Sequence, residues 1–112
     1  MAEARRFERI RANRQVRIRT PSGVEVDAKI IDLSIGGAGI LYSAPAEPGT
    51  ILELRFVLPV GADLRPFVLK GIVRHGRLTA QGHVFGVEFL EVDADDRRAL
   101  LMFVLWSKDI RA

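Results

Sequence analysis

Apolar and polar residues alternate along most of this chain, and turn residues divide the alternation into short segments. A period of two is typical of strands that bury one face. Proline, glycine and serine fall between the segments, as at Pro21-Ser22-Gly23, where a turn would close a hairpin. The pattern therefore predicts six short strands, over residues 15–19, 24–31, 38–43, 51–57, 68–76 and 82–90.

The regular spacing of these strands favours a closed antiparallel barrel. Closure would also remove the exposed edges that an open sheet leaves for unwanted pairing. The segment from Pro59 to Pro66 is rich in turn residues and predicts a loop between the fourth and fifth strands. Gly86 interrupts the last strand and indicates a bulge or a close backbone approach. We expect the barrel to occupy residues 15–92.

The chain changes character after Val92, and the new pattern predicts a helix over about 94–107, within a C-terminal unit of residues 93–110. Asp93 is a good N-cap, and the acidic residues that follow it suit the positive end of a helix. The fold class is therefore all-β with a C-terminal helix.

Residues 99–106 of this helix are apolar on every side, although a helix that covers a small domain should keep a polar outer face. Surplus apolar surface usually marks a contact with a partner. We expect a partner protein or a second copy of this chain to bind there. The candidate residues are Leu100, Leu101, Phe103, Val104 and Trp106.

Composition excludes several classes of function. The chain has 112 residues, enough for one domain, and no cysteine, which excludes disulfides and thiolate metal sites. A metal site at His75 and His83 would lack a third ligand, and His75 is expected at the surface, where the fifth strand ends. Neither a nucleophile–base pair nor a phosphate loop is visible in the sequence, so we do not expect an enzyme.

The sequence also bears on location. The N-terminus lacks the apolar core of a signal peptide, and the longest apolar run is too short to span a bilayer. We therefore expect a cytoplasmic protein without membrane insertion.

Arginine dominates the first twenty residues, where only Glu3 and Glu8 oppose it. The guanidinium group binds phosphates and guanine edges through paired hydrogen bonds, which suits an anionic partner. Residues 1–14 show little periodicity and are expected to form a flexible basic arm. The alternative explanation is a solvated tail that aids solubility.

Two short motifs sharpen this picture. Arg5 and Arg9 form an RxxxR pattern, and the segment from Asp32 to Gly37 follows the pattern DxSxxG. Their order, ahead of the strands and the terminal helix, resembles the PilZ domain, a bacterial receptor for cyclic di-GMP. The resemblance covers roughly Arg5 to Trp106. Taken alone, the second motif is also explained by a turn that its aspartate and serine cap.

The resemblance implies a PilZ-like barrel that binds cyclic di-GMP as a ligand and needs no cofactor. The arginines would grip guanine edges and phosphates, and the carboxylate would accept hydrogen bonds from a guanine. The serine hydroxyl would bond to the ligand, and the two glycines would form a tight turn with exposed amides. The residues expected to bind the ligand are Arg5, Arg6, Arg9, Asp32, Ser34, Gly36 and Gly37.

The arm would then fold over the ligand, and a partner protein would receive the signal. Two other functions stay open. One is a PilZ-like module that contacts proteins without binding a nucleotide. The other is a small-barrel binder of single-stranded nucleic acid, although the aromatic residues that stack on bases are scarce. We expect no specific binding of DNA.

Overall fold

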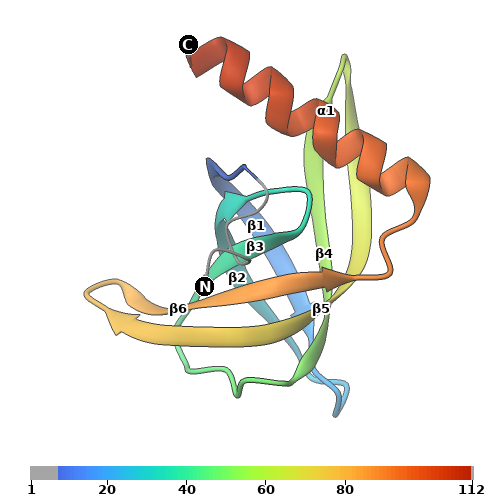
Figure 1. The fold of residues 1–112 in the computed structure, drawn as a ribbon. Helices are drawn as coiled ribbons and strands as arrows, with labels where there is room; N and C mark the ends of the chain where they lie inside the picture. Colours follow the sequence, from blue (N-terminus) through green and yellow to red (C-terminus); the bar gives the residue numbers. More distant parts are fainter. Residues whose placement is uncertain (1–7, 112) are drawn as a thin grey trace.

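Six strands pair in antiparallel fashion and close into a barrel in the computed structural model, which describes residues 8–111 and side chains up to residue 108 (Figure 1). Around the barrel the order is β1-β2-β3-β6-β5-β4, and β4 pairs with β1 to close it. The predicted fold class is confirmed. The strands are β1 (Ile10–Arg19), β2 (Glu25–Leu33), β3 (Gly37–Tyr42), β4 (Ile51–Val60), β5 (Asp63–Thr79) and β6 (Gly82–Leu90).

The period-two pattern of the sequence arises because alternate side chains fill the barrel. In β4, for example, Leu52, Leu54, Phe56 and Leu58 are buried, whereas the residues between them are exposed or half-buried. The Phe56 ring stacks on the ring of Phe67 from β5, with 5.2 Å between the centroids. The interior is therefore a packed core.

The predicted loop between Pro59 and Pro66 is wrong. β4 continues to Val60 and β5 begins at Asp63, so only a two-residue turn separates them, with Gly61 at a positive φ of 63°. The hairpin extends beyond the pairings of β4 with β1 and of β5 with β6. In this part of the hairpin β4 and β5 pair only with each other, and a sheet tolerates proline in strands that have a single neighbour.

Two other boundaries differ from the expected ones. β1 begins at Ile10 rather than at Gln15, because the start of β1 pairs with the end of β2. β5 continues to Thr79, so His75 lies within a strand rather than at its end. Gly86 was expected to mark a bulge or a close approach in the sixth strand, but the bulge lies in β5, where the β5–β6 register shifts between Val73 and His75, opposite this glycine.

Helix α1 (Ala94–Arg111) lies across one end of the barrel (Figure 1). Its predicted cap is confirmed, because the amide of Asp96 donates to Oδ1 of Asp93 at 2.7 Å. Nη1 of Arg65 donates to Oδ1 of Asp96 at 2.8 Å and ties the helix start to β5. Among residues 8–111, no helix is long and apolar enough to cross a membrane.

Part of the expected partner surface on α1 is wrong, because one face of the helix is buried against the barrel. Leu100, Phe103 and Val104 belong to the core, because they recur at the helical spacing that faces the open end of the barrel. Only Leu101 and Trp106 of the candidate residues are exposed. Further exposed apolar residues join them, so the outer stripe of α1 consists of Leu101, Met102, Leu105 and Trp106.

Replacing Leu100 by alanine tests how far the barrel depends on this helix. Leu100 is fully buried, so we expect Leu100→Ala to lower the free energy of unfolding by about 2–5 kcal/mol. Leu101→Ala is the matched control on the exposed side, with an expected change of about 0.5 kcal/mol or less. Urea titration followed by circular dichroism measures both values. Equal effects of the two substitutions would contradict the assignment of the buried face.

Candidate functional site

The two sequence motifs meet where β2 ends. Asp32 is half-buried, and its Oδ1 accepts a hydrogen bond from the amide of Gly39 on β3 at 3.1 Å. The same oxygen accepts a second bond from Nη1 of Arg9 at 3.0 Å. Arg5 and Arg6 lie outside the described residues. The described arginine of the first motif is therefore in direct contact with the carboxylate of the second.

Strand pairing explains this contact. Ile10 is opposite Leu33 in the β1–β2 register, so the residue before β1 lies beside the last residues of β2. Gly39 was not expected from the sequence as a site residue. Its position opposite Asp32 across the β2–β3 pair depends on a register shift between Ile30 and Asp32. A side chain at Gly39 would press on the carboxylate, since an added Cβ would lie 2.7 Å from Oδ2 of Asp32.

The turn from Ser34 to Gly37 is closed by its own hydrogen bonds. The amides of Gly36 and Gly37 both donate to Oγ of Ser34 at 3.1 Å, and the amide of Ser34 donates to the Gly37 carbonyl at 2.9 Å. Ser34 is buried. The expectation of exposed glycine amides is therefore corrected, because the serine hydroxyl accepts both of them. These are the local bonds that explain the motif as a capped turn.

The same turn is anchored to β6. The amide of Phe89 donates to the carbonyl oxygen of Gly36 at 2.9 Å. A Cβ on Gly37 would overlap the carbonyl oxygen of Val87, so this position requires glycine for the close approach of the two strands. The turn therefore gives Asp32 a rigid setting.

Two other arginines near the N-terminus form ion pairs on the outer surface of the barrel. Arg19 on β1 donates to Oε2 of Glu25 at 2.7 Å, and Arg17 donates to Oε1 of the same residue at 3.2 Å. The pKa of Glu25 lies below its usual value, mainly because of the hydrogen bond from Arg19 and secondly because of that from Arg17. The hydrogen bond to Glu25 in turn raises the pKa of Arg19. In the β1–β2 register Arg17 is opposite Asp27 and Arg19 is opposite Glu25, so both arginines lie at the other end of the hairpin from Asp32.

The segment around Arg9 also contacts α1. Nζ of Lys108 donates to Oε1 of Glu8 at 2.8 Å. Further along β1, the guanidinium group of Arg14 lies over the ring of Phe103, 5.8 Å from its centroid. These contacts were not visible from the sequence, because the partners are about a hundred positions apart. They place the helix end next to the candidate site.

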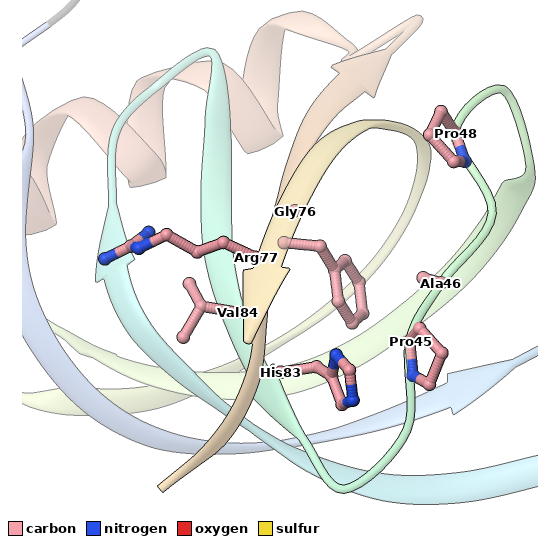
Figure 2. Close-up of a pocket in the computed structure, with 8 residues that line it drawn as sticks. Pro45, Ala46, Pro48, Gly76, Arg77, His83 and Val84 are labelled. Carbon is pink, nitrogen blue, oxygen red and sulfur yellow. The ribbon is translucent and has the colours of Figure 1, made fainter. Parts of the chain in front are cut away.

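A separate pocket of about 170 Å³ lies between the loop that follows β3 and the β5–β6 hairpin. Figure 2 shows His83 on the side of Pro45, whereas the side chains of Arg77 and Val84 point to the opposite side of the hairpin. No carboxylate lines this pocket, so it lacks the paired guanidinium and carboxylate groups found around Asp32. Within the described part of the chain, no three His, Cys, Asp or Glu residues are grouped to hold a metal ion.

A closed barrel with an arginine–aspartate pair on its surface defines a small domain with groups suited to guanine and phosphate. The chain belongs to the PilZ domain family, whose model matches residues 3–106. Comparison with curated protein sequences finds no match.

Solved structures share the fold at low identity. The inhibitor of motility MotI/DgrA from Bacillus subtilis is 21% identical with a TM-score of 0.85, over 95% of this chain and 52% of that one. The PilZ domain of YcgR from Escherichia coli, solved with c-di-GMP, is 16% identical with a TM-score of 0.71, over 95% and 92%. The PilZ domain of CeSA from a cellulose-synthesizing bacterium is 22% identical with a TM-score of 0.63, over 88% and 98%. The chain thus spans about half the length of the Bacillus protein.

Proposed function

We propose that this domain is a receptor for cyclic di-GMP that changes the conformation of its N-terminal segment on binding and relays the change to a partner protein. The observation that carries the proposal is the contact of 3.0 Å between Arg9 and Asp32. It joins the two motifs that the family resemblance assigns to the ligand. The role is that of a receptor and not of an enzyme.

The chemistry of guanine matches this pair of side chains. Arginine bonds the O6 and N7 acceptors of one guanine edge, and a carboxylate accepts from the N–H donors of another edge. Without ligand, Arg9 and Asp32 neutralise each other. Their side chains are about one third exposed, at 33% and 30%, and an ion pair this open to water adds little stability. A guanine nucleotide could therefore replace the pair at small cost.

Arg5 and Arg6 precede Arg9 and would add contacts to the phosphates and the second base. The turn of Ser34, Gly36 and Gly37 would complete the site by holding Asp32 in place. Fixing a backbone residue costs about 1–2 kcal/mol, so the contacts that the arm makes with the ligand must exceed this cost. That requirement makes the conformation of the arm depend on the ligand.

The relay would run through the neighbouring contacts with α1. Glu8 is bonded to Lys108 and is adjacent to Arg9, so a movement of Arg9 toward a ligand would disturb the end of the helix. The outer stripe of α1 (Leu101, Met102, Leu105 and Trp106) is exposed and apolar, as expected of a surface that contacts a protein. We propose that a protein partner binds this stripe.

The structure offers less support for binding of single-stranded nucleic acid. Such binders present aromatic rings on the strands of a barrel, where bases stack on them. Here Phe56, Phe67, Phe85 and Phe89 are all buried in the core, and the large exposed apolar residues of the described strands are aliphatic. A PilZ-like module that contacts proteins without a nucleotide is the alternative that binding measurements would distinguish.

Isothermal titration with cyclic di-GMP tests the receptor role. We expect the full chain to bind and Arg9→Ala to weaken binding about tenfold or more, because a hydrogen bond to a charged group contributes about 1.5–3 kcal/mol. Arg55→Ala is the matched control, since Arg55 is an exposed arginine on β4, outside the motifs. Absence of binding by the wild type, or unchanged affinity of Arg9→Ala, would overturn the proposal.

Fluorescence of Trp106, the single tryptophan, tests the relay. We expect saturation with cyclic di-GMP to shift its emission maximum, because the ligand would release the Glu8–Lys108 contact at the helix end. Lys108→Ala removes this contact in advance and should reduce the shift while leaving the affinity within about threefold. An emission spectrum that stays the same at full saturation would contradict a relay through α1.

A further inference from the structure

The last part of β5, beyond Val73, has one strand neighbour. It pairs with β6 over residues 75–79, whereas β4 pairs with β5 only as far as Ile72. The loop that follows β3 bonds to β5 at Val73, where the amide of Gly49 donates to the Val73 carbonyl at 2.7 Å. Within residues 8–111, no backbone hydrogen bond joins this loop to a later residue of β5. This part of β5 is therefore an open edge.

The hairpin turn decides which backbone groups point toward the open edge. Thr79 and Gly82 flank a two-residue turn, so they form a hydrogen-bonded pair. Hydrogen-bonded and non-hydrogen-bonded pairs then alternate along the ladder, and Gly76 and Leu78 belong to pairs of the second kind. The N–H and C=O groups of these two residues therefore point away from β6. Both residues are exposed.

The β4–β5 hairpin illustrates how open edges of this chain are protected. By the same alternation from its own two-residue turn, Pro59 and Pro66 occupy positions whose backbone nitrogen points outward. Proline has no N–H, so each edge of that hairpin lacks a donor that an added strand would need. Residues 74–79 of β5 contain no proline. Because proteins usually block their open edges, an unprotected one indicates a surface for strand addition.

The pocket of about 170 Å³ lies beside this edge, between β5 and the loop that follows β3 (Figure 2). Gly76 lines it from β5, and Pro45 and Ala46 line it from the loop. The ring of Phe85 on β6 adds an apolar wall. An apolar cavity of about 150 Å³ accepts a molecule the size of benzene. The pocket therefore has room for one apolar side chain of a segment that pairs with the β5 edge.

Charge favours an acidic segment. Arg77 lies between the two outward-facing residues, and its side chain points to the outer side of the hairpin (Figure 2). The neighbouring Arg74 is paired with Glu88, whereas no ion pair among residues 8–108 includes Arg77. An acidic side chain opposite Arg77 on an added strand would form a cross-strand ion pair.

The same charge disfavours a second copy of this chain at the edge. An antiparallel pairing that uses Gly76 and Leu78 of both copies would place the two Arg77 side chains opposite each other. Like charges directly opposite each other destabilise a strand pair. A partner of different sequence therefore fits this edge better.

We propose that the β5 edge at residues 76–78 and the adjoining pocket bind an extended acidic segment of a partner protein, which adds to the sheet as a strand. The residue opposite Gly76 would place an apolar side chain in the pocket, the next would be an aspartate or glutamate beside Arg77, and the third would be apolar, beside Leu78. Alternation of side chains along a strand gives this pattern. The site lies away from α1 and does not depend on the proposed binding of cyclic di-GMP (Figure 1).

Fluorescence anisotropy with a labelled synthetic peptide of alternating valine and glutamate tests the chemistry of the partner. We expect the full chain to bind it saturably with a Kd of about 100 μM or tighter. The same peptide with lysine in place of glutamate should bind about fivefold more weakly or less, and Arg77→Glu should reverse this preference. Absence of binding, or a preference that Arg77→Glu leaves unchanged, would overturn the proposal.

Leu78→Pro tests the addition of a strand. It removes an outward N–H from a strand with a single neighbour, as Pro59 and Pro66 do, so we expect the variant to fold, and circular dichroism verifies this. Binding of the glutamate peptide should weaken about fivefold or more. Leu78→Ala is the matched control, because it keeps the N–H, and it should stay within about threefold of the wild type. Equal losses in the two variants would rule out main-chain pairing.

Amide hydrogen exchange gives a readout on the unmodified chain. We expect the amides of Gly76 and Leu78 to exchange rapidly in the free domain and to become protected when the glutamate peptide saturates it. The amide of Arg77 is the internal control, since it belongs to a hydrogen-bonded pair with β6 and should be protected in both states. Protection of Gly76 and Leu78 without peptide would contradict an open edge. A dimer in sedimentation that Leu78→Pro dissociates would assign the edge to a second copy and would also overturn the proposal.

Discussion

The pairing of β1 with β2 is the constraint on which the site depends. Ile10 is opposite Leu33, and this register brings the residue before the barrel next to the last residues of β2. Arg9 and Asp32 are 23 positions apart in the chain and 3.0 Å apart in space for this reason. A slip of one residue would turn the side chains of β2 to opposite faces and would separate the pair.

In the closed barrel, the two charged residues of the candidate site are held to different degrees. Asp32 is fixed by the amide of Gly39, and the following turn is anchored to β6 through Phe89. Arg9 precedes β1, outside the ladder of strand hydrogen bonds, and its described partner is Asp32. An exposed ion pair of this kind contributes little to stability, so a ligand can exchange with it. The proposed switch follows from this difference between a fixed carboxylate and an exchangeable arginine.

The sequence predicted those features that depend on neighbouring residues. The period of two located the strands, and Asp93 marked the helix start, because both signals are local. The hairpin at Gly61 was missed, since Pro59 and Pro66 indicate a loop unless the single-partner ends of β4 and β5 are known. The burial of Leu100 was missed because a helix that is apolar on every side does not reveal which face meets the barrel.

The candidate site, too, could be predicted only where its signal lies in neighbouring residues of the sequence. Asp32 and Ser34 were identified from a motif, but the role of Ser34 within the turn depends on bonds that only the structure shows. The face of the sheet that His75 joins could not be predicted, because a bulge in β5 decides it. Contacts such as that of Glu8 with Lys108 depend on the closed fold and leave no signal in the sequence.

We propose that Arg9 and Asp32 act on one ligand as a unit, and a double-mutant cycle measures their coupling. Cyclic di-GMP affinities are determined for the wild type, Arg9→Ala, Asp32→Ala and the double variant. We expect a coupling free energy of about 1 kcal/mol or more between the two residues. Additive losses, or losses that are absent altogether, would contradict it.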